Sequence, residues 1–240
     1  MPPSGDTVRL LEADPDLAAA LGPEAREEAG SAAVAAVQTL EEGGWDATGA
    51  FGDGRGWLGV FILTGFLTRE NVLGRDTIAE LLGPGDLLRP WDRDSEYGMP
   101  EVHVSWTVLE PTRLALLDAE FAKRVAPWPE LVAALVGRLG ERARWLGLRI
   151  GISHLDRVEA RLLILFVHLA DRWGRPAAEG RVLEAPLTHA LLAALTGARR
   201  PSVTTALTAL SRRELIVRRA DGSWLVARDA SQEMGRMLGA

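Results

Sequence analysis

Residues 197–208 read Gly-Ala-Arg-Arg-Pro-Ser-Val-Thr-Thr-Ala-Leu-Thr, and this stretch decides how the C-terminal third of the chain folds. Upstream, Thr188 is of a type that caps a helix by accepting a backbone N–H. Two apolar faces at helical spacing flank the glycine, one at Leu191, Leu192 and Leu195, the other at Val203, Ala206, Leu207 and Leu210. Glycine adopts positive φ without strain, so Gly197 suits a sharp turn between two helices. The order predicts a helix-turn-helix.

The opposite face of the second helix is polar. At about 100° per residue it carries Pro201, Thr205, Thr208 and Arg212, with Arg200 and Ser202 at its leading edge. An arginine such as Arg200 donates two parallel hydrogen bonds to guanine, worth about 1–3 kcal/mol of discrimination. The hydroxyls of Ser202, Thr204 and Thr205 are expected at phosphates or base edges, or beside a thymine methyl group. Arg199 and Arg212 are expected to neutralise phosphates, and Thr188 joins the expected DNA contacts.

Two leucine-rich helices joined at a glycine are also compatible with a plain helical hairpin inside a core. The sequence downstream favours DNA binding instead. Residues 215–219 and 223–226 flank Ala-Asp-Gly, which predicts a β-hairpin that would act as a wing, with Arg218 and Arg219 at the DNA backbone. Eight arginines against three acidic residues give residues 181–228 a charge of +5, while the remainder carries 19 basic and 30 acidic residues, or −11. This asymmetry suits a basic reading head on an acidic body.

Composition excludes several classes of protein. The 240 residues include no cysteine, which excludes disulfides and thiolate metal sites. The N-terminus has no basic flank and no apolar segment of signal-peptide type, and the longest apolar run, residues 162–169, is too short to span a membrane. We therefore expect a soluble, cytoplasmic protein.

The rest of the chain predicts an α+β fold. Residues 1 to about 40 have a weakly amphipathic, Ala-rich pattern typical of helix. Short apolar runs at 57–63, 77–82, 102–109 and 112–117, with a Gly-Pro-Gly-Asp turn at 83–86, predict an antiparallel roll or sandwich. A long amphipathic helix is expected over 130–153, a hinge near 151–157, and an apolar helix over 158–173.

The narrow seam of the long helix leaves two interpretations. Its apolar positions include Leu135, Leu139, Ala143, Leu146 and Ile150. A helix lying on its own domain has such a face, and so does a helix that pairs with a second copy in a dimer.

Taken together, these segments resemble the Crp/Fnr family of bacterial transcription regulators over nearly the whole chain. The matching pieces are Leu82–Asp86, the helix at 130–153, Asp156 leading into Arg161, and above all residues 187–216. The resemblance implies a β-roll of the double-stranded β-helix type at 1–128, a dimerisation helix and hinge at 129–155, and a winged helix-turn-helix at 156–240. It also implies a homodimer on double-stranded DNA, with RNA polymerase and a small-molecule effector of unknown identity as further partners.

On this resemblance, Arg200 falls where the family places its guanine-reading arginine, and Ser202 where a hydroxyl meets phosphate. Pro201 and Thr205 stand where better-known members have charged base-reading side chains. The roll departs further from the family's nucleotide-binding pattern. The Gly-Asp turn leads into residues 87–92, Leu-Leu-Arg-Pro-Trp-Asp, and residues 101–105 lack the phosphate-binding arginine.

We therefore expect no cofactor and no bound cyclic nucleotide, since a buried phosphate needs a positive partner. Arg89, Trp91 and His103 are the candidates for an effector pocket, although Trp91 is also compatible with packing of the roll. The four histidines have no metal-ligand spacing, and no metal site or catalytic residue is expected.

A non-enzymatic regulator is the interpretation that these observations favour. One alternative is a ligand-binding roll whose DNA head is vestigial. A second is an enzyme on a cupin-like barrel, which would need His and Glu clusters on the strands.

Overall fold

A computed structural model describes residues 5–47, 49–73, 76–91 and 103–239. The chain folds as two compact units, the first comprising residues 1–74 and 81–144 and the second residues 75–80 and 145–240. None of the helices in the described ranges is both long enough and apolar enough to cross a membrane.

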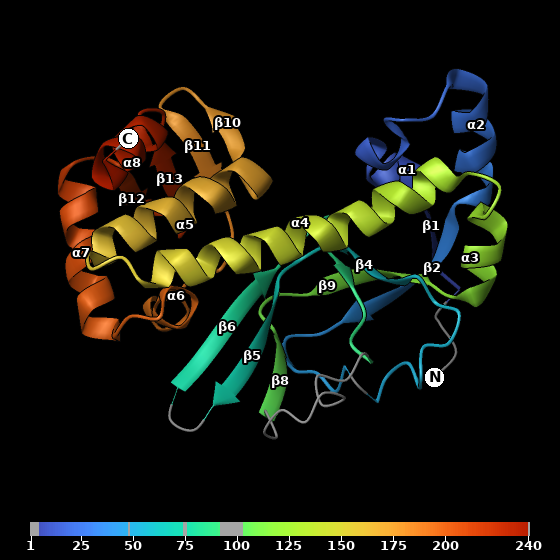
Figure 1. Cartoon of the computed structure of the whole chain (residues 1–240), viewed down its shortest axis with the longest axis horizontal. Helices are drawn as coiled ribbons and strands as arrows, with labels where there is room; N and C mark the ends of the chain where they lie inside the picture. The colour runs from blue at the N-terminus through green and yellow to red at the C-terminus, as the bar shows by residue number, and fades with distance from the viewer. Residues whose placement is uncertain (1–4, 48, 74–75, 92–102, 240) are drawn as a thin grey trace. The chain divides into compact units, whose positions relative to one another are not determined.

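The first unit is built on antiparallel strands in two sheets (Figure 1). One sheet has the order β1 (Thr7–Arg9), β2 (Val34–Leu40), β9 (Thr112–Leu117), β4 (Gly59–Thr64) and β7 (Leu87–Leu88). The other has the order β3 (Gly43–Gly44), β8 (His103–Val108), β5 (Leu67–Leu73) and β6 (Asp76–Leu82). The predicted α+β class with an antiparallel roll is confirmed.

The prediction of helix through residue 40 is wrong in its last part. Only α1 (Leu10–Ala13), a 3-10 turn at Pro15–Ala18 and α2 (Pro23–Ala32) are helical, and residues 34–40 form β2. Ala35 and Val37 are buried while their neighbours are partly exposed, which is the period of a strand. The strand pairs with β9, from Ala36 opposite Leu116 to Leu40 opposite Thr112, and this distant partner overrides the helix propensity of alanine.

Helices close one side of the first unit. Asp118 caps α3 (Ala119–Val125) by accepting a hydrogen bond from the backbone N–H of Phe121 at 2.7 Å. The long α4 (Pro129–Ser153) begins here, and α1, α2 and α3 gather around its N-terminal end (Figure 1). Leu131 and Leu135 of α4 are fully buried in this core, and Arg138 of α4 pairs with Asp14 at 2.7 Å.

The second unit contains the predicted helix-turn-helix. The order is α5 (Val158–Trp173), β10 (Arg175–Ala177), β11 (Gly180–Leu183), α6 (His189–Thr196), α7 (Arg200–Arg212), β12 (Ile216–Arg218), β13 (Trp224–Ala227) and α8 (Ala230–Leu238). The strands form one sheet in the order β10-β11-β13-β12. Helix α5 buries nine of its residues, and the ring of one of them, Phe166, lies 5.0 Å from that of Trp224.

Candidate nucleic-acid interface

Helices α6 and α7 meet at the predicted turn. Thr188 caps α6, its hydroxyl oxygen accepting from the backbone N–H of Leu191 at 3.1 Å. Gly197 ends α6 in the left-handed conformation, at φ 62° and ψ 31°, which a residue with a side chain rarely adopts. Pro201 stands in the first turn of α7, where its missing N–H leaves no intrahelical bond unmade.

Two arginines outside the helix-turn-helix hold this turn in place. Arg161 of α5 donates from Nη1 to the carbonyl oxygens of Thr196 and Gly197, both at 3.3 Å. Arg149, near the end of α4, donates from Nη2 to the carbonyl oxygen of Leu195 at 2.7 Å. These carbonyls end a helix and have no intrahelical partner, so the arginines satisfy them. These hydrogen bonds were not predicted, because no local sequence pattern links an arginine to a carbonyl oxygen 36 or 46 residues away.

The polar face of α7 lies on the surface as expected. Val203, Ala206, Leu207 and Leu210 are buried. All eleven residues predicted to contact DNA are exposed: Thr188, Arg199, Arg200, Pro201, Ser202, Thr204, Thr205, Thr208, Arg212, Arg218 and Arg219. Their side chains therefore lie where a duplex has access to them.

The threonine hydroxyls of α7 are already committed within the helix. Thr204, Thr205 and Thr208 each donate to the carbonyl oxygen four residues earlier, at 3.1, 3.2 and 2.9 Å. Nδ1 of His189 lies 3.0 Å from the hydroxyl oxygen of Thr204. Because the hydroxyl of Thr204 donates its hydrogen to the carbonyl oxygen of Arg200, His189 is the donor in this bond. The bond links α6 to α7.

The wing is a two-stranded hairpin. Strands β12 and β13 pair from Ile216 opposite Val226 to Arg218 opposite Trp224. Asp221 in the turn accepts from both the hydroxyl and the N–H of Ser223, at 2.6 and 3.0 Å, and these bonds hold the pKa of Asp221 below its usual range. The guanidinium of Arg218 lies 5.4 Å from the ring centre of Trp224. This cation–π contact holds the exposed guanidinium of Arg218 against the hairpin.

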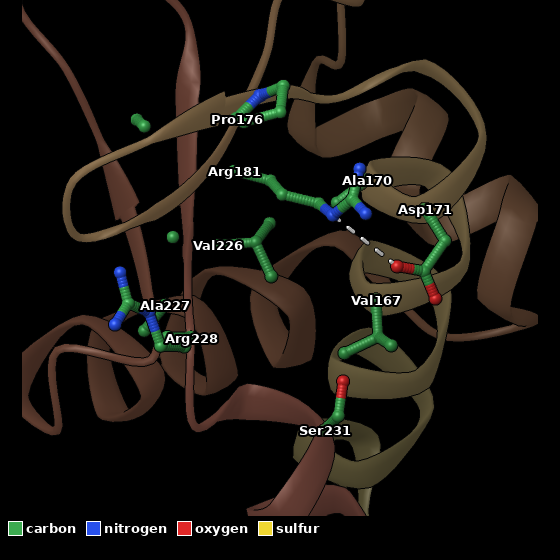
Figure 2. Close-up of a pocket in the computed structure, with 11 residues that line it drawn as sticks. Val167, Ala170, Asp171, Pro176, Arg181, Val226, Ala227, Arg228 and Ser231 are labelled. Carbon is green, nitrogen blue, oxygen red and sulfur yellow. Dashed lines mark ion pairs between the residues drawn. The ribbon is translucent and has the colours of Figure 1, made fainter.

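Two pockets lie in the second unit. The first, of about 330 Å³, is lined by the start of α5 and by the outward side of α7, including Arg157, Glu159, Ser202 and Thr205. The second, of about 310 Å³, lies among α5, β10, β11, β13 and α8 (Figure 2). Arg181 points across it toward Asp171, with Nε 3.6 Å from Oδ1 (Figure 2). No motif in the sequence pointed to this second pocket.

Of the three residues expected in an effector pocket, Arg89 and Trp91 lie next to each other. The guanidinium of Arg89 donates to the backbone oxygen of Trp57 at 2.8 Å and lies 5.5 Å from the ring centre of Trp91. Trp91 is only 8% exposed and packs in an aromatic cluster with Phe51 and Trp57. His103 is exposed on β8, opposite Val72 of β5.

The expected dimer seam on α4 is divided between two environments. Leu135 is fully buried in the core of the first unit and has no surface for a partner, and Leu139 packs against the same core. Leu146 is half-buried, Ala143 is exposed, and Ile150 is 65% exposed. Among the described residues, no group of His, Asp or Glu side chains has the arrangement of a metal site.

Comparison with known proteins agrees with this geometry. The model of the Crp-like helix-turn-helix domain matches residues 156–239. The whole fold is similar to a cyclic nucleotide-binding domain containing protein from Listeria monocytogenes (16% identity, 93% of this chain and 99% of that chain covered, TM-score 0.64). It is also similar to FixK2 from Bradyrhizobium japonicum (12% identity, 84% and 96% covered, TM-score 0.61). The C-terminal part of the chain therefore matches the Crp-like helix-turn-helix domain, and the fold of the chain is similar to that of these solved structures.

A third similar structure is a transcriptional regulator of the CRP/FNR family from Thermus thermophilus (20% identity, 83% and 98% covered, TM-score 0.57). No curated protein sequence matches the chain. Identity in the range of 12–20% shows a shared fold and does not identify a ligand.

Proposed function

We propose that this chain is a transcription regulator of the Crp/Fnr family, that it acts as a homodimer that binds specific DNA sequences, and that the roll controls this binding in response to a small molecule. The observation that carries the proposal is the outward face of α7, where Arg200 is exposed at the first turn of a helix whose other face is buried. Within the described residues, Arg199, Arg200 and Arg212 form no ion pair, so their full charge is available to a phosphate or a guanine.

Helix α4 supports the dimer through its exposed side. Six residues, at alternating steps of three and four, are small or apolar: Ala133, Val136, Gly140, Ala143, Gly147 and Ile150. That is the spacing at which one helix faces another in a coiled coil. Val136 and Ile150 are 57% and 65% exposed, so they remain available to a second copy. A twofold dimer would place its recognition helices about 34 Å apart, in successive major grooves.

The dimer is tested by the mass of the chain in solution. Ile150→Glu puts a charge on the seam, and we expect it to convert a dimer into a monomer. Leu148→Glu is the matched control, because Leu148 is 57% exposed on the same helix but lies outside the seam. Equal dimerisation of the two variants would exclude this face.

The proposed effector is a small molecule other than a cyclic nucleotide. Arg89 already donates to main-chain oxygens of the roll and stacks near Trp91, so the proposal excludes cyclic nucleotides and leaves another small molecule. In this proposal the chain is not an enzyme, and it acts in the cytoplasm. RNA polymerase is a further partner in the proposal. A calorimetric titration with cyclic AMP that showed tight binding would overturn the exclusion.

The main experiment maps the DNA that the chain binds. Selection from random duplexes is expected to enrich a near-palindrome with a guanine in each half-site. Arg200→Ala should lose the preference for that guanine while keeping weak, salt-dependent binding. Arg212→Ala is the matched control, and we expect it to weaken all sequences alike and to lower the salt slope by about 1. Failure to enrich any sequence would favour the alternative of a vestigial DNA head.

A further inference from the structure

The side-chain hydrogen-bond donors on the exposed side of α7 are unevenly distributed. Arg200 offers several N–H groups, whereas Pro201 has an apolar ring and no side-chain donor. Thr204, Thr205 and Thr208 follow on the exposed surface of the same helix. Beyond Arg200 and Ser202, the reading of bases by this face therefore depends on its threonines.

The threonine hydroxyls have no hydrogen left for a base. A carbonyl oxygen has no hydrogen to give, so in each of the three bonds the hydroxyl must be the donor. The oxygen of Thr204 also accepts from His189, which completes its local bonding. Thr205 differs from Thr204 because no second partner approaches its oxygen in the described part of the chain, and it donates to Pro201 at 3.2 Å. What Thr205 presents to DNA is its methyl group and an oxygen that can only accept.

Pro201 and Thr205 are neighbours on the helix surface, one turn apart, and the bond between them keeps them together. The Pro201 ring and the Thr205 methyl group are apolar groups on this exposed face, and Pro201 directly follows Arg200 in the sequence. In the major groove, the apolar feature of a base edge is the C5-methyl group of thymine.

We infer that Pro201 and Thr205 read thymine methyl groups beside the guanine that Arg200 reads. The inference rests on the proposed function, and it names the base chemistry that the recognition helix selects. It follows that thymine should occur in each half-site at the positions facing residues 201 and 205. Cytosine, which has no methyl group at C5, should be rejected there, although its amino group would suit an accepting oxygen.

The test replaces thymine by deoxyuridine in operators selected with the full chain. Deoxyuridine keeps the same hydrogen-bonding edge and lacks only the methyl group, so binding should weaken about fourfold for each methyl group that is read. Thymines outside the two half-sites are the control within the same duplex, and their replacement should have no effect.

Two variants of Thr205 separate its methyl group from its hydroxyl. Thr205→Val keeps a methyl group and loses the hydroxyl, so it should retain the preference for thymine over deoxyuridine. Thr205→Ser keeps the hydroxyl and loses the methyl group, so that preference should fall toward one. Thr205 is exposed, so neither change disturbs the core, and circular dichroism checks that both variants fold.

Each outcome decides the matter. Loss of the preference in the serine variant alone supports methyl reading. Indifference of the wild-type chain to deoxyuridine, or loss of the preference in the valine variant alone, overturns it while the proposed function stands. Absence of any selected operator overturns the proposed function, and this inference with it.

Discussion

We expect His168 to make the stability of the second unit depend on pH. Its ring stacks on that of Trp145, with ring centres 3.4 Å apart and planes at 10°, and its Nε2 is buried without a hydrogen-bond partner. Burial, together with the positive charges of Arg172 and Arg149, lowers the pKa of His168 to about 4. We expect His168→Gln to reduce the loss in the free energy of unfolding of the second unit as the pH falls.

The size of the effect follows from proton linkage. The unfolded chain protonates His168 near its ordinary pKa of 6.5, whereas the folded chain does so near 4. Between these values the unfolded state holds more protons, so the free energy of unfolding falls as the pH falls from 6.5 toward 4. The full shift corresponds to about 3.4 kcal/mol at 1.36 kcal/mol per pKa unit. Because the ring is only partly buried, solvent screening reduces the expected loss to about 1–2 kcal/mol.

The assay compares urea unfolding at about pH 7.5 and about pH 5. Pulsed hydrogen exchange in peptides from α5 reports the second unit separately from the first. The wild-type chain should lose about 1 kcal/mol more than His168→Gln between these pH values, since the unfolded ring is then largely protonated. His154→Gln is the control, because His154 is exposed. Parallel pH profiles for the wild-type chain and His168→Gln would refute the reasoning.

Substitutions at three further positions test the contacts and backbone conformations that support the helix-turn-helix. Gly197→Ala should destabilise the second unit by about 1 kcal/mol in urea unfolding, because an added Cβ meets no atom within 4 Å and only backbone strain at positive φ remains. Gly197→Asn should cost less, and an equal cost would contradict this cause. Arg149→Ala should destabilise by about 2 kcal/mol and raise hydrogen exchange at the end of α6, because it leaves the carbonyl of Leu195 unpaired. Glu214→Gly should raise the melting temperature by about 2–4 °C, since Glu214 has a φ of 56° that glycine adopts without strain; an unchanged melting temperature would exclude strain there.

The local patterns of the sequence were sufficient to predict three helices of the second unit, α5, α6 and α7, and the turn between α6 and α7. The apolar spacing in α5, α6 and α7, the cap at Thr188 and the glycine turn all act over a few residues, so periodicity reveals them. Four strands of the roll, β4, β6, β8 and β9, were predicted from apolar runs and turns, whereas β2 and β5 were not predicted. The exposed positions of the expected DNA contacts followed from the same helical period. Their roles in binding stay predictions until the experiments above are done.

The failures concern partners that are distant in sequence. Strand β2 has a composition typical of helix, and its pairing with β1 and β9 makes it a strand. The hairpin of β10 and β11 escaped notice because β10 is short and exposed, and β11 takes its place by pairing with β13. The hydrogen bonds of Arg149 and Arg161 to the ends of α6 belong to the same class. Side-chain bonds to carbonyls leave no periodic signal, so a sequence pattern cannot reveal them.

Helix α4 shows how the strongest hydrophobic pattern can mislead about an interface. Its leucines predict one face, and Leu131 and Leu135 of that face lie in the core of their own unit. The exposed line is made largely of glycine and alanine, which contribute little hydropathy. Glycine inside a helix costs about 1 kcal/mol relative to alanine, and α4 contains four glycines. Two of these glycines, Gly140 and Gly147, lie on the exposed line. An added Cβ at Gly147 would meet no atom within 4 Å, and one at Gly140 would meet only Nη1 of Arg144, at 3.4 Å, so packing within the described chain does not require their small size. The close approach of a second backbone would require it, and for this reason the proposed dimer uses the line of Gly140 and Gly147 and not the leucines of α4.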